Sequence, residues 1–269
     1  MTCMKPFLKW AGGKYRLVDR IKSALPAGDR LIEPFVGSGA VFLNTDYKSY
    51  LLMDSNPDLI NLYKFLQTEG QNFINYCSSF FTSENNNELT FYQFREEFNT
   101  ITDIRKKSAL FVYLNRHCFN GLCRYNSKGG FNVPFGRYSK PAIPEDDMFS
   151  FYQKSANAIF AVADFRETME KAKTGDVIYC DPPYVPLSAT SSFTSYATGG
   201  FGIQEQNDLA ALAKKLQSKG IPVVISNHDT EYTNEVYKPA EIIKFNVQRF
   251  ISSDTKNRNA VGELLAIFG

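Results

Sequence analysis

The segment Tyr-Cys-Asp-Pro-Pro-Tyr (179–184) places an acid, two prolines and an aromatic ring directly after a run of apolar residues. The run 176–180 predicts a buried strand, and the two prolines must end it because neither has an N–H group for the ladder. Asp181 therefore lies at the carboxyl end of a strand. In open α/β sheets this edge is where ligands bind.

An acid and a rigid backbone carbonyl at this position are suited to activating the exocyclic amine of a nucleobase. The lone pair of such an amine is delocalised into the ring, so the nitrogen must become more tetrahedral before it attacks. Asp181 and the carbonyl of Pro182 can accept the two amine hydrogens, and Tyr184 can stack on the base. With a sulfonium methyl group as electrophile, catalysis is mainly alignment, which contributes about 7–11 kcal/mol.

A second candidate site is the glycine turn Phe-Val-Gly-Ser-Gly (35–39), followed by Asp54 at the end of the apolar run 50–54. Glycine lets a ligand approach the backbone, and an acid one strand later accepts hydrogen bonds from ribose hydroxyls. The turn lacks the third glycine of dinucleotide sites and a Lys-Ser or Lys-Thr pair for triphosphates. It therefore favours an adenosine ligand without phosphate, and S-adenosylmethionine is the common one.

The elements that must position these residues predict an α/β domain interrupted by a helical insert. Strand patterns occur at 31–32, 50–54, 159–162, 177–180, 222–227, 241–250 and 264–268. Helical patterns occur near 17–25, 41–44, 91–98, 104–114 and 209–216. Strands that alternate with helices predict a parallel sheet. Between 57 and 144 helices and a glycine- and asparagine-rich loop replace the strands.

The bulk composition fits one large domain or a large domain with an insert. The chain has 269 residues, of which 43% are hydrophobic and 22% charged. No uncharged apolar run approaches the length of a membrane span, and no secretory signal is readable. The five cysteines are scattered, and His117 with Cys118 and Cys123 offers too few ligands for a metal, so we predict no metal and a reducing cytoplasm.

The charge is unevenly distributed along the chain. Residues 90–140 contain nine Lys or Arg against three Asp or Glu, together with 11 of the 39 aromatic residues. Basic and aromatic residues in one segment are what phosphate contacts and base stacking require. The same composition is also consistent with a solvated helical face over an aromatic core.

Taken together, the motifs resemble the Dam family of DNA adenine-N6 methyltransferases, in the D12 class. The resemblance covers nearly the whole chain and rests on seven motifs in order: FLKWAGGK (7–14), FVGSG (35–39), YQFREEFN (92–99), NGLCRYN (120–126), FNVPFGRY (131–138), DPPY (181–184) and ISNHDT (225–230). It implies a Rossmann-like, S-adenosylmethionine-dependent methyltransferase sheet with a helical DNA-recognition insert. The implied catalytic domain comprises 1–56 and 145–269, and the target recognition domain 57–144.

The resemblance also implies the reaction and the residues that perform it. A methyl group passes from S-adenosylmethionine to N6 of adenine in double-stranded 5′-GATC-3′ after the base is flipped. The implied catalytic residues are Asp181, Pro182, Pro183 and Tyr184. The implied cofactor-binding residues are Trp10, Lys14, Phe35, Gly37, Gly39, Asp54 and Asp181. Among them, Lys14 is matched to the contact with the methionine carboxylate.

The implied DNA-binding residues fall into groups with different tasks. The GATC sequence is read by Lys9, Leu122, Arg124 and Pro134. The DNA backbone is contacted by Arg95, Asn126, Asn132 and Arg137. Further DNA contacts are assigned to Arg116, Phe119 and Asn120. A bidentate Arg124–guanine pair discriminates by about 1–3 kcal/mol, and apolar side chains can meet a thymine methyl.

The sequence departs from the family pattern at three positions and has one long polar loop. Phe119 stands where the family often has a tyrosine that stacks in the space left by the flipped base. Ser139 replaces a frequent lysine, and Asp254 lies in an otherwise basic segment, which suggests weaker or more salt-sensitive DNA binding. We expect the loop 185–201 to close over the flipped base.

Several alternatives remain open at this point. Taken singly, Trp10 is consistent with a core aromatic, Asp54 with a strand-end cap, Asp181 with a turn former and Arg124 with a surface cation. The same fold can also methylate a protein glutamine or an RNA base, and a third possibility is a DNA-binding protein that has lost catalysis. We predict a monomer in the cytoplasm, associated with the nucleoid. Its role is in mismatch repair, replication and gene regulation or in protection from a GATC restriction nuclease.

Overall fold

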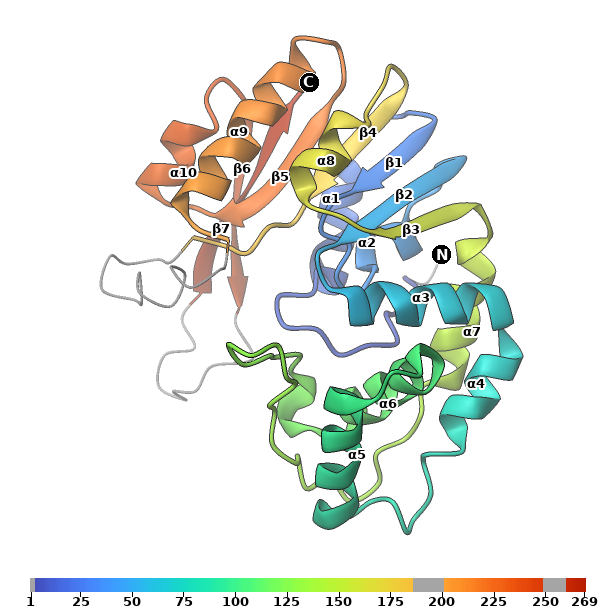
Figure 1. Ribbon diagram of the computed structural model, residues 1–269. Coiled ribbons are helices and arrows are strands. Elements are labelled where there is room, and N and C mark those ends of the chain that lie inside the picture. The colour runs from blue at the N-terminus through green and yellow to red at the C-terminus, as the bar shows by residue number, and fades with distance from the viewer. Residues whose placement is uncertain (1–2, 186–200, 249–259) are drawn as a thin grey trace. The chain divides into compact units, whose positions relative to one another are not determined.

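The structure, a computed structural model that describes residues 3–185, 201–248 and 260–269, contains a seven-stranded sheet with helices (Figure 1). The strands are β1 Arg30–Glu33, β2 Ser49–Asp54, β3 Ala158–Val162, β4 Asp176–Cys180, β5 Val223–His228, β6 Glu241–Gln248 and β7 Ala260–Phe268. Their order in the sheet is β3-β2-β1-β4-β5-β7-β6. The predicted α/β class is confirmed.

The sheet follows the doubly wound order 3-2-1-4-5-6 with β7 inserted between β5 and β6. The pairs β1–β4 and β4–β5 are parallel, whereas β7 is antiparallel to both β5 and β6. The prediction of a parallel sheet is therefore wrong for β7. Only residues 249–259 separate β6 from β7, and this is shorter than the crossover of a dozen or more residues that parallel neighbours need.

The chain divides into two compact units. Unit 1 comprises residues 1–19, 36–46 and 51–162, and unit 2 comprises 20–35, 47–50 and 163–269. This division describes packing within the chain. The assignment of 57–144 to DNA recognition stays a prediction.

Unit 1 is mostly helical. Its helices are η1 Tyr15–Leu17, α2 Ala40–Asn44, α3 Pro57–Glu69, α4 Gln71–Ser78, α5 Glu88–Thr100, α6 Ile104–His117, η2 Phe119–Gly121, α7 Glu145–Lys154 and η3 Ser155–Asn157. The central helix is α6, which packs against α3, α4 and α5 (Figure 1). Its residues 108–115 are all buried, so α6 forms the core of this unit.

Side-chain caps fix where the long helices of unit 1 begin. Asn56 accepts the N–H groups of residues 58 and 59 at the start of α3, and Pro57 occupies the first helical position, where no N–H is needed. Asn87 caps α5 and Asp103 caps α6 in the same way. Each cap stabilises its helix by about 1 kcal/mol, because it satisfies N–H groups that have no partner inside the helix.

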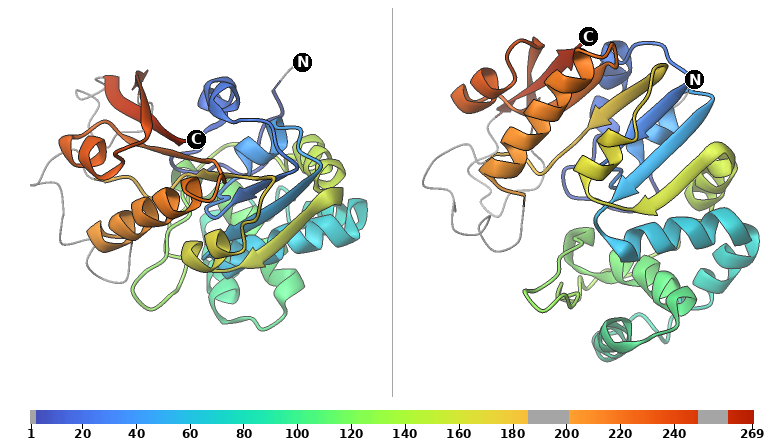
Figure 2. Two further views of the ribbon diagram at one scale, coloured as in Figure 1. Left: turned by 90° about the horizontal axis from the view of Figure 1, so that it is seen from above. Right: turned by 45° about the horizontal axis from the view of Figure 1, so that its top comes forward.

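Unit 2 contains β1, β4, β5, β6 and β7 with most of α1 Val18–Ala24, and α8 Phe165–Glu170, α9 Ile203–Gln217 and α10 Glu231–Val236. Figure 2 shows α9 alongside β5 and α8, and α9 contacts both. Its buried residues are Gln206, Leu209, Ala210, Ala213 and Leu216. This spacing of three and four places them on one helix face.

A buried ion pair joins β1 to β4 where the two strands begin. Asp176 has only 3% of its side chain exposed, and its carboxylate accepts Nε of Arg30 at 3.0 Å and Nη2 at 2.6 Å. The backbone N–H of Lys173 donates to the same carboxylate at 2.8 Å. Since Arg30 and Asp176 are also paired in register, this contact fixes the alignment of the two strands.

We predict that Arg30→Ala lowers the free energy of unfolding by about 3 kcal/mol, because it leaves a buried carboxylate without its cation. Urea unfolding at pH 7, followed by circular dichroism, measures the change. The matched control is Lys48→Ala, which removes the pair with Asp29 in which both side chains are largely exposed. The control is expected to leave the unfolding midpoint in place. Equal losses in both variants would contradict the prediction.

Candidate functional site

Asp181 follows β4 at the point in unit 2 where the strand order reverses. All five residues of β4 are buried, and the strand ends at Cys180 directly before Asp181. The adjacent parallel strand β1 leads into Phe35, whose ring stacks on Phe165 at 5.6 Å. Carboxyl ends of neighbouring parallel strands at such a reversal form the usual ligand site of open α/β sheets.

One oxygen of the Asp181 carboxylate is bound by a buried hydroxyl. Oγ of Ser226 donates to Oδ1 of Asp181 at 3.0 Å, and the hydroxyl of Tyr179 lies 3.1 Å from the same Oγ. Both hydroxyl-bearing residues are about 1% exposed. The Asp181 carboxylate is therefore held by side chains of the sheet strands β4 and β5.

A buried polar network holds the backbone that follows Asp181. Nε2 of Gln206 donates to the carbonyl of Pro183 at 2.8 Å, and the N–H of Val185 donates to Oδ1 of Asn227 at 3.2 Å. Nδ2 of Asn227 also donates to Oε1 of Gln206 at 3.1 Å and to the hydroxyl of Tyr237 at 2.8 Å. Because every polar group finds a partner, this network rigidifies the segment.

The side chain of Tyr184 contacts Glu263, His228 and Ser226 in unit 2. Its hydroxyl donates to Oε2 of Glu263 at 3.3 Å, and its ring meets His228 edge-on at 4.8 Å. Nδ1 of His228 in turn lies 2.7 Å from the carbonyl of Val185. Burial raises the pKa of Tyr184 well above its usual value, and the negative charge of Asp181 adds to this, so the hydroxyl remains a donor.

In unit 1 the glycine turn is hydrogen-bonded to Asp54, a contact that the sequence analysis did not predict. The N–H of Gly37 donates to Oδ2 of Asp54 at 3.2 Å, and the N–H of Asn56 donates to Oδ1 at 3.0 Å. Burial raises the pKa of Asp54, while these backbone donors counteract part of the rise because they stabilise the ionised form. An ionised carboxylate has about four acceptor positions, so both oxygens can still accept a hydroxyl.

Trp10 packs so closely against the glycine turn that a Cβ at position 37 would force its indole to shift. Gly37 has φ +47°, and a Cβ there would lie 3.0 Å from Nε1 of Trp10. Gly39 has φ +74°, and a Cβ there would lie 3.3 Å from the ring of Phe151. The hydroxyl of Tyr63 donates to the carbonyl of Gly37 at 2.5 Å and holds the turn from the other side.

Lys14, four residues after Trp10 in the sequence, is a buried cation. Only 7% of Lys14 is exposed, and its Nζ donates to the carbonyl of Gly12 at 2.6 Å. Five of the predicted cofactor-binding residues thus lie in unit 1, namely Trp10, Lys14, Gly37, Gly39 and Asp54. The other two, Phe35 and Asp181, lie in unit 2.

All of the predicted DNA-binding residues lie in unit 1. The buried side-chain amide of Asn115 links Lys9 to the loop that follows α6. Asn115 on α6 is 2% exposed; its Oδ1 accepts the N–H of Lys9 at 3.0 Å, and its Nδ2 donates to the carbonyls of Lys9 and Gly121. The Nζ of Lys9 lies 4.5 Å from the ring centroid of Tyr138. Lys9 is thereby fixed beside the loop that follows α6.

In that loop, residues 118–138, exposed side chains extend from a backbone that is held by hydrogen bonds. Phe119 is 51% exposed, and Asn120 adopts a left-handed conformation with φ +54°. Arg124 is exposed, and its guanidinium donates to Oδ1 of Asn132 at 2.8 Å and to the carbonyl of Asn132 at 3.2 Å. Bridges between Cys118 and Phe135 and between residues 125 and 131 close the base of the loop.

The remaining predicted DNA-binding residues differ in how accessible they are. Asn126, Pro134 and Arg137 are exposed, and Leu122 is half-buried. Arg95 donates to the carbonyl of Val133 at 3.2 Å, and Arg137 is paired with Glu88 at 3.0 Å. The guanidinium of Arg116 donates to the carbonyl of Ala142 at 3.1 Å and so connects two segments within unit 1. Burial lowers the pKa of Arg116.

The sequence interpretation assigned no role to the residues that hold these sites in place. They are Asn115, Tyr138, Tyr179, Gln206, Ser226, Asn227 and Tyr237. A signal existed for Gln206 and Asn115, because each is a polar residue within the apolar face of a helix. No comparable signal exists for Tyr179 in β4 and Tyr237 after α10, because a buried tyrosine is common in cores.

His117, the best metal candidate of the sequence, is a core residue. It is 1% exposed, its ring stacks on Tyr113 at 3.8 Å, and burial lowers its pKa to about 4. Within the described ranges, no cluster of three or more metal-ligating side chains occurs. No helix in the described part of the chain combines the length and apolar character that a membrane span requires.

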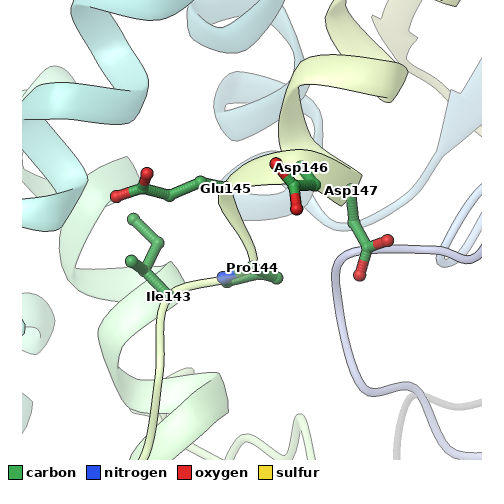
Figure 3. Close-up of a pocket in the computed structure, with 5 residues that line it drawn as sticks. All are labelled: Ile143, Pro144, Glu145, Asp146 and Asp147. Carbon is green, nitrogen blue, oxygen red and sulfur yellow. The ribbon is translucent and has the colours of Figure 1, made fainter.

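A pocket of about 360 Å³ lies at the start of α7, away from the predicted site residues in sequence. Ile143, Pro144, Glu145, Asp146 and Asp147 line it. Figure 3 shows that the three carboxylates point in different directions and do not converge on one position. Three acids repel phosphate, so this pocket does not fit the backbone of a nucleic acid.

Two expectations from the sequence fall outside the described residues. The loop predicted to close over a flipped base spans residues 185–201, of which 186–200 lie outside the described ranges, and so does Asp254. Both expectations stay predictions.

Comparisons with known proteins agree on one family. Residues 10–251 match the model of the D12 class N6 adenine-specific DNA methyltransferases. The chain is 54% identical to a DNA adenine methylase of Serratia marcescens over 98% of both chains. It is 50% identical to one of Vibrio cholerae over 100% of this chain and 97% of the relative, and 49% identical to one of Escherichia coli K12 over 98% and 95%.

Proposed function

Because the chain belongs to the D12 class of N6 adenine-specific DNA methyltransferases, we propose that it methylates N6 of adenine in double-stranded 5′-GATC-3′ with S-adenosylmethionine as donor. The observation that carries the proposal is the fixed segment 181–185. It combines a carboxylate at the end of β4 with a network that holds the following backbone. This is the arrangement that activation of an exocyclic amine requires.

The residues of the segment have distinct roles in the proposed reaction. When bound, S-adenosylmethionine supplies an electrophilic methyl group on a sulfonium. Asp181 and the carbonyl of Pro182 accept the two hydrogens of the adenine amine and draw its lone pair out of the ring. Tyr184 stacks on the base and fixes its plane, and the amine loses one proton to Asp181 or to water once the methyl group has been transferred. Alignment of this kind contributes about 7–11 kcal/mol.

The residues of the glycine turn fit an adenosine ligand. Asp54 is held by two backbone N–H groups and retains lone pairs for ribose hydroxyls. Gly37 and Gly39 carry no side chain, so a ligand can approach the backbone of the turn at these two positions. We assign Trp10, Lys14, Phe35, Gly37, Gly39, Asp54 and Asp181 to the cofactor. The buried ammonium of Lys14 fits a carboxylate.

We assign DNA recognition to residues 57–144 together with Lys9. The exposed tips of the loop 118–138 suit base contacts, with Arg124 for guanine and Leu122 and Pro134 for a thymine methyl. The exposed ring of Phe119 suits stacking where the target base has left the duplex, which supports base flipping. Arg95, Asn126, Asn132 and Arg137 are assigned to the DNA backbone, with Arg116 and Asn120 beside them.

Family membership favours adenine in DNA over the alternative substrates, a protein glutamine or an RNA base. Retention of Asp181, Pro182 and Tyr184 argues against a protein that has lost catalysis. A monomeric state, a place in the cytoplasm near the nucleoid, and roles in repair, replication, gene regulation or protection from a restriction nuclease stay predictions.

The first prediction concerns substrate and chemistry together. The purified protein, incubated with tritiated S-adenosylmethionine, is expected to label a GATC duplex and not a GATT duplex. Asp181→Ala is expected to abolish the label because the amine loses its acceptor. Scintillation counting of captured DNA measures both. Equal label on the two duplexes would refute the assigned sequence recognition, and label by the variant would refute the role of Asp181.

The second prediction separates base reading from backbone contact. Arg124→Ala is expected to lower the preference for GATC over a duplex that lacks this guanine. The loss is about 1–3 kcal/mol, because a bidentate contact is removed. Arg137→Ala is the matched control from the same loop. It is expected to weaken binding to all duplexes alike and to flatten the salt dependence. Fluorescence anisotropy and kcat/KM on both duplexes distinguish the two. Uniform weakening by both variants would contradict the assignment of Arg124.

The third prediction uses Trp10, the single tryptophan of the chain. S-adenosylmethionine is expected to change the fluorescence of Trp10 saturably. Gly37→Ala is expected to weaken cofactor binding about tenfold, or about 1.4 kcal/mol, because the new Cβ displaces the indole. Gly220→Ala is the control: it has a comparable φ of +70° and nothing within 4 Å of a Cβ. A cofactor affinity equal in both variants would argue against a site at the turn.

A further inference from the structure

Two buried hydroxyls form a chain that ends at one oxygen of Asp181. Oγ of Ser226 lies 3.0 Å from Oδ1 of Asp181 and 3.1 Å from the hydroxyl of Tyr179. It also lies 3.4 Å from the carbonyl of Cys180, a longer and weaker contact. Both hydroxyls are inside the sheet, where an isolated polar group is costly.

The number of protons decides the direction of these hydrogen bonds. An ionised carboxylate only accepts, and a hydroxyl has one proton to donate. Ser226 therefore gives its proton to Asp181 and accepts from Tyr179. Burial, with the charge of Asp181, raises the pKa of Tyr179 well above its usual value, so Tyr179 stays protonated and remains a donor. The result is a directed chain from Tyr179 through Ser226 to Asp181.

Strand pairing places the three residues together. Residues 179 and 181 are two apart, so their side chains point to the same face of the sheet. Cys180 is paired with Ile225 in the parallel β4–β5 register, which brings Ser226 opposite Asp181. The neighbouring residues of β5, Val223, Val224 and Ile225, are buried and apolar. Ser226 and Tyr179 thus place their hydroxyls among apolar residues at the position from which the chain to Asp181 can form.

We infer that Ser226 and Tyr179 are positioning residues that fix the orientation of the Asp181 carboxylate, which accepts the adenine amine. The inference rests on the proposed catalytic role of Asp181. Ser226 orients the carboxylate directly, and Tyr179 acts through Ser226 by fixing the rotation of its hydroxyl. Neither residue belongs to the proposed DNA-binding set, so we expect their loss to affect the chemical step and not the binding of DNA.

The test measures kcat and the KM values for DNA and S-adenosylmethionine in Ser226→Ala, Tyr179→Phe and the double variant. Ser226→Ala is expected to lower kcat roughly 10- to 100-fold, the range for loss of a hydrogen bond to a charged group, with the KM for DNA changed by less than about threefold. Tyr179→Phe is expected to lower kcat by about threefold to fivefold. The double variant is expected to match Ser226→Ala, because Tyr179 acts only through Ser226.

The controls remove equally buried hydroxyls that serve only the backbone. Ser155→Ala removes a hydroxyl that donates to the carbonyl of Tyr152, and Tyr113→Phe removes one that donates to the carbonyl of Asn85. Both are expected to keep kcat within about twofold of the native enzyme. Thermal unfolding confirms that each variant is folded before its kinetics are compared.

The outcomes separate this inference from the proposal on which it rests. An unchanged kcat in Ser226→Ala, with Asp181→Ala inactive, overturns the positioning role and leaves the role of Asp181 intact. An active Asp181→Ala overturns both. Independent, multiplying losses in the double variant overturn the directed chain. If Ser226→Ala does not fold, Tyr179→Phe decides alone: a lower kcat at unchanged KM for DNA supports the inference, and an unchanged kcat overturns it.

Discussion

The parallel pairing of β4 with β5 is the constraint on which the candidate catalytic segment depends. Its register brings Ser226 opposite Asp181 and places Asn227 within reach of Val185. A shift of one residue would turn both polar side chains of β5 to the opposite faces of the sheet. The carboxylate would then lose its donor, and the backbone after the two prolines would lose its anchor. The chemistry proposed for the segment is thus tied to a single strand register.

Polar groups inside a sheet stabilise a structure only when all of them are paired. Gln206, Asn227 and Tyr237 satisfy one another and also bind the carbonyl of Pro183 and the N–H of Val185. An apolar core of equal volume would be at least as stable, because a hydrogen bond contributes only about 1 kcal/mol net. The segment after β4 leaves the sheet, and its two prolines have no N–H groups for sheet hydrogen bonds. Side-chain hydrogen bonds must therefore hold this segment, and an apolar core cannot supply them. The network is explained by the rigidity it gives to that segment.

The sequence predicted the local features well because short-range chemistry determines them. The proline pair ends β4, as expected, and residues 35–39 form the predicted glycine turn, in which Gly37 and Gly39 have positive φ. The antiparallel β7 was missed because strand direction depends on pairing partners far apart in sequence. Ser226 and Asn227 were seen as part of a motif without a role, since that role exists only once β5 lies beside β4. Arg116 was predicted to contact DNA, and its hydrogen bond to the carbonyl of Ala142 could not be inferred from the sequence, because residue 142 lies 26 positions away.

The loop 118–138, which we propose reads the DNA sequence, is both exposed and ordered. Each of its exposed side chains lies on a backbone tied to the helical core, through Asn115, the bridge to Phe135 and the Phe119–Pro134 hydrogen bond of 2.8 Å. Arg124 is held by Asn132 before any partner arrives. Ordering a long side chain on binding costs about 0.5–1.5 kcal/mol, so a guanidinium that is already oriented keeps more of its contact energy for the base. The same restraint penalises a base that cannot complete the contact, because the fixed arginine cannot adapt to it. Order in the free protein therefore favours specificity over general affinity.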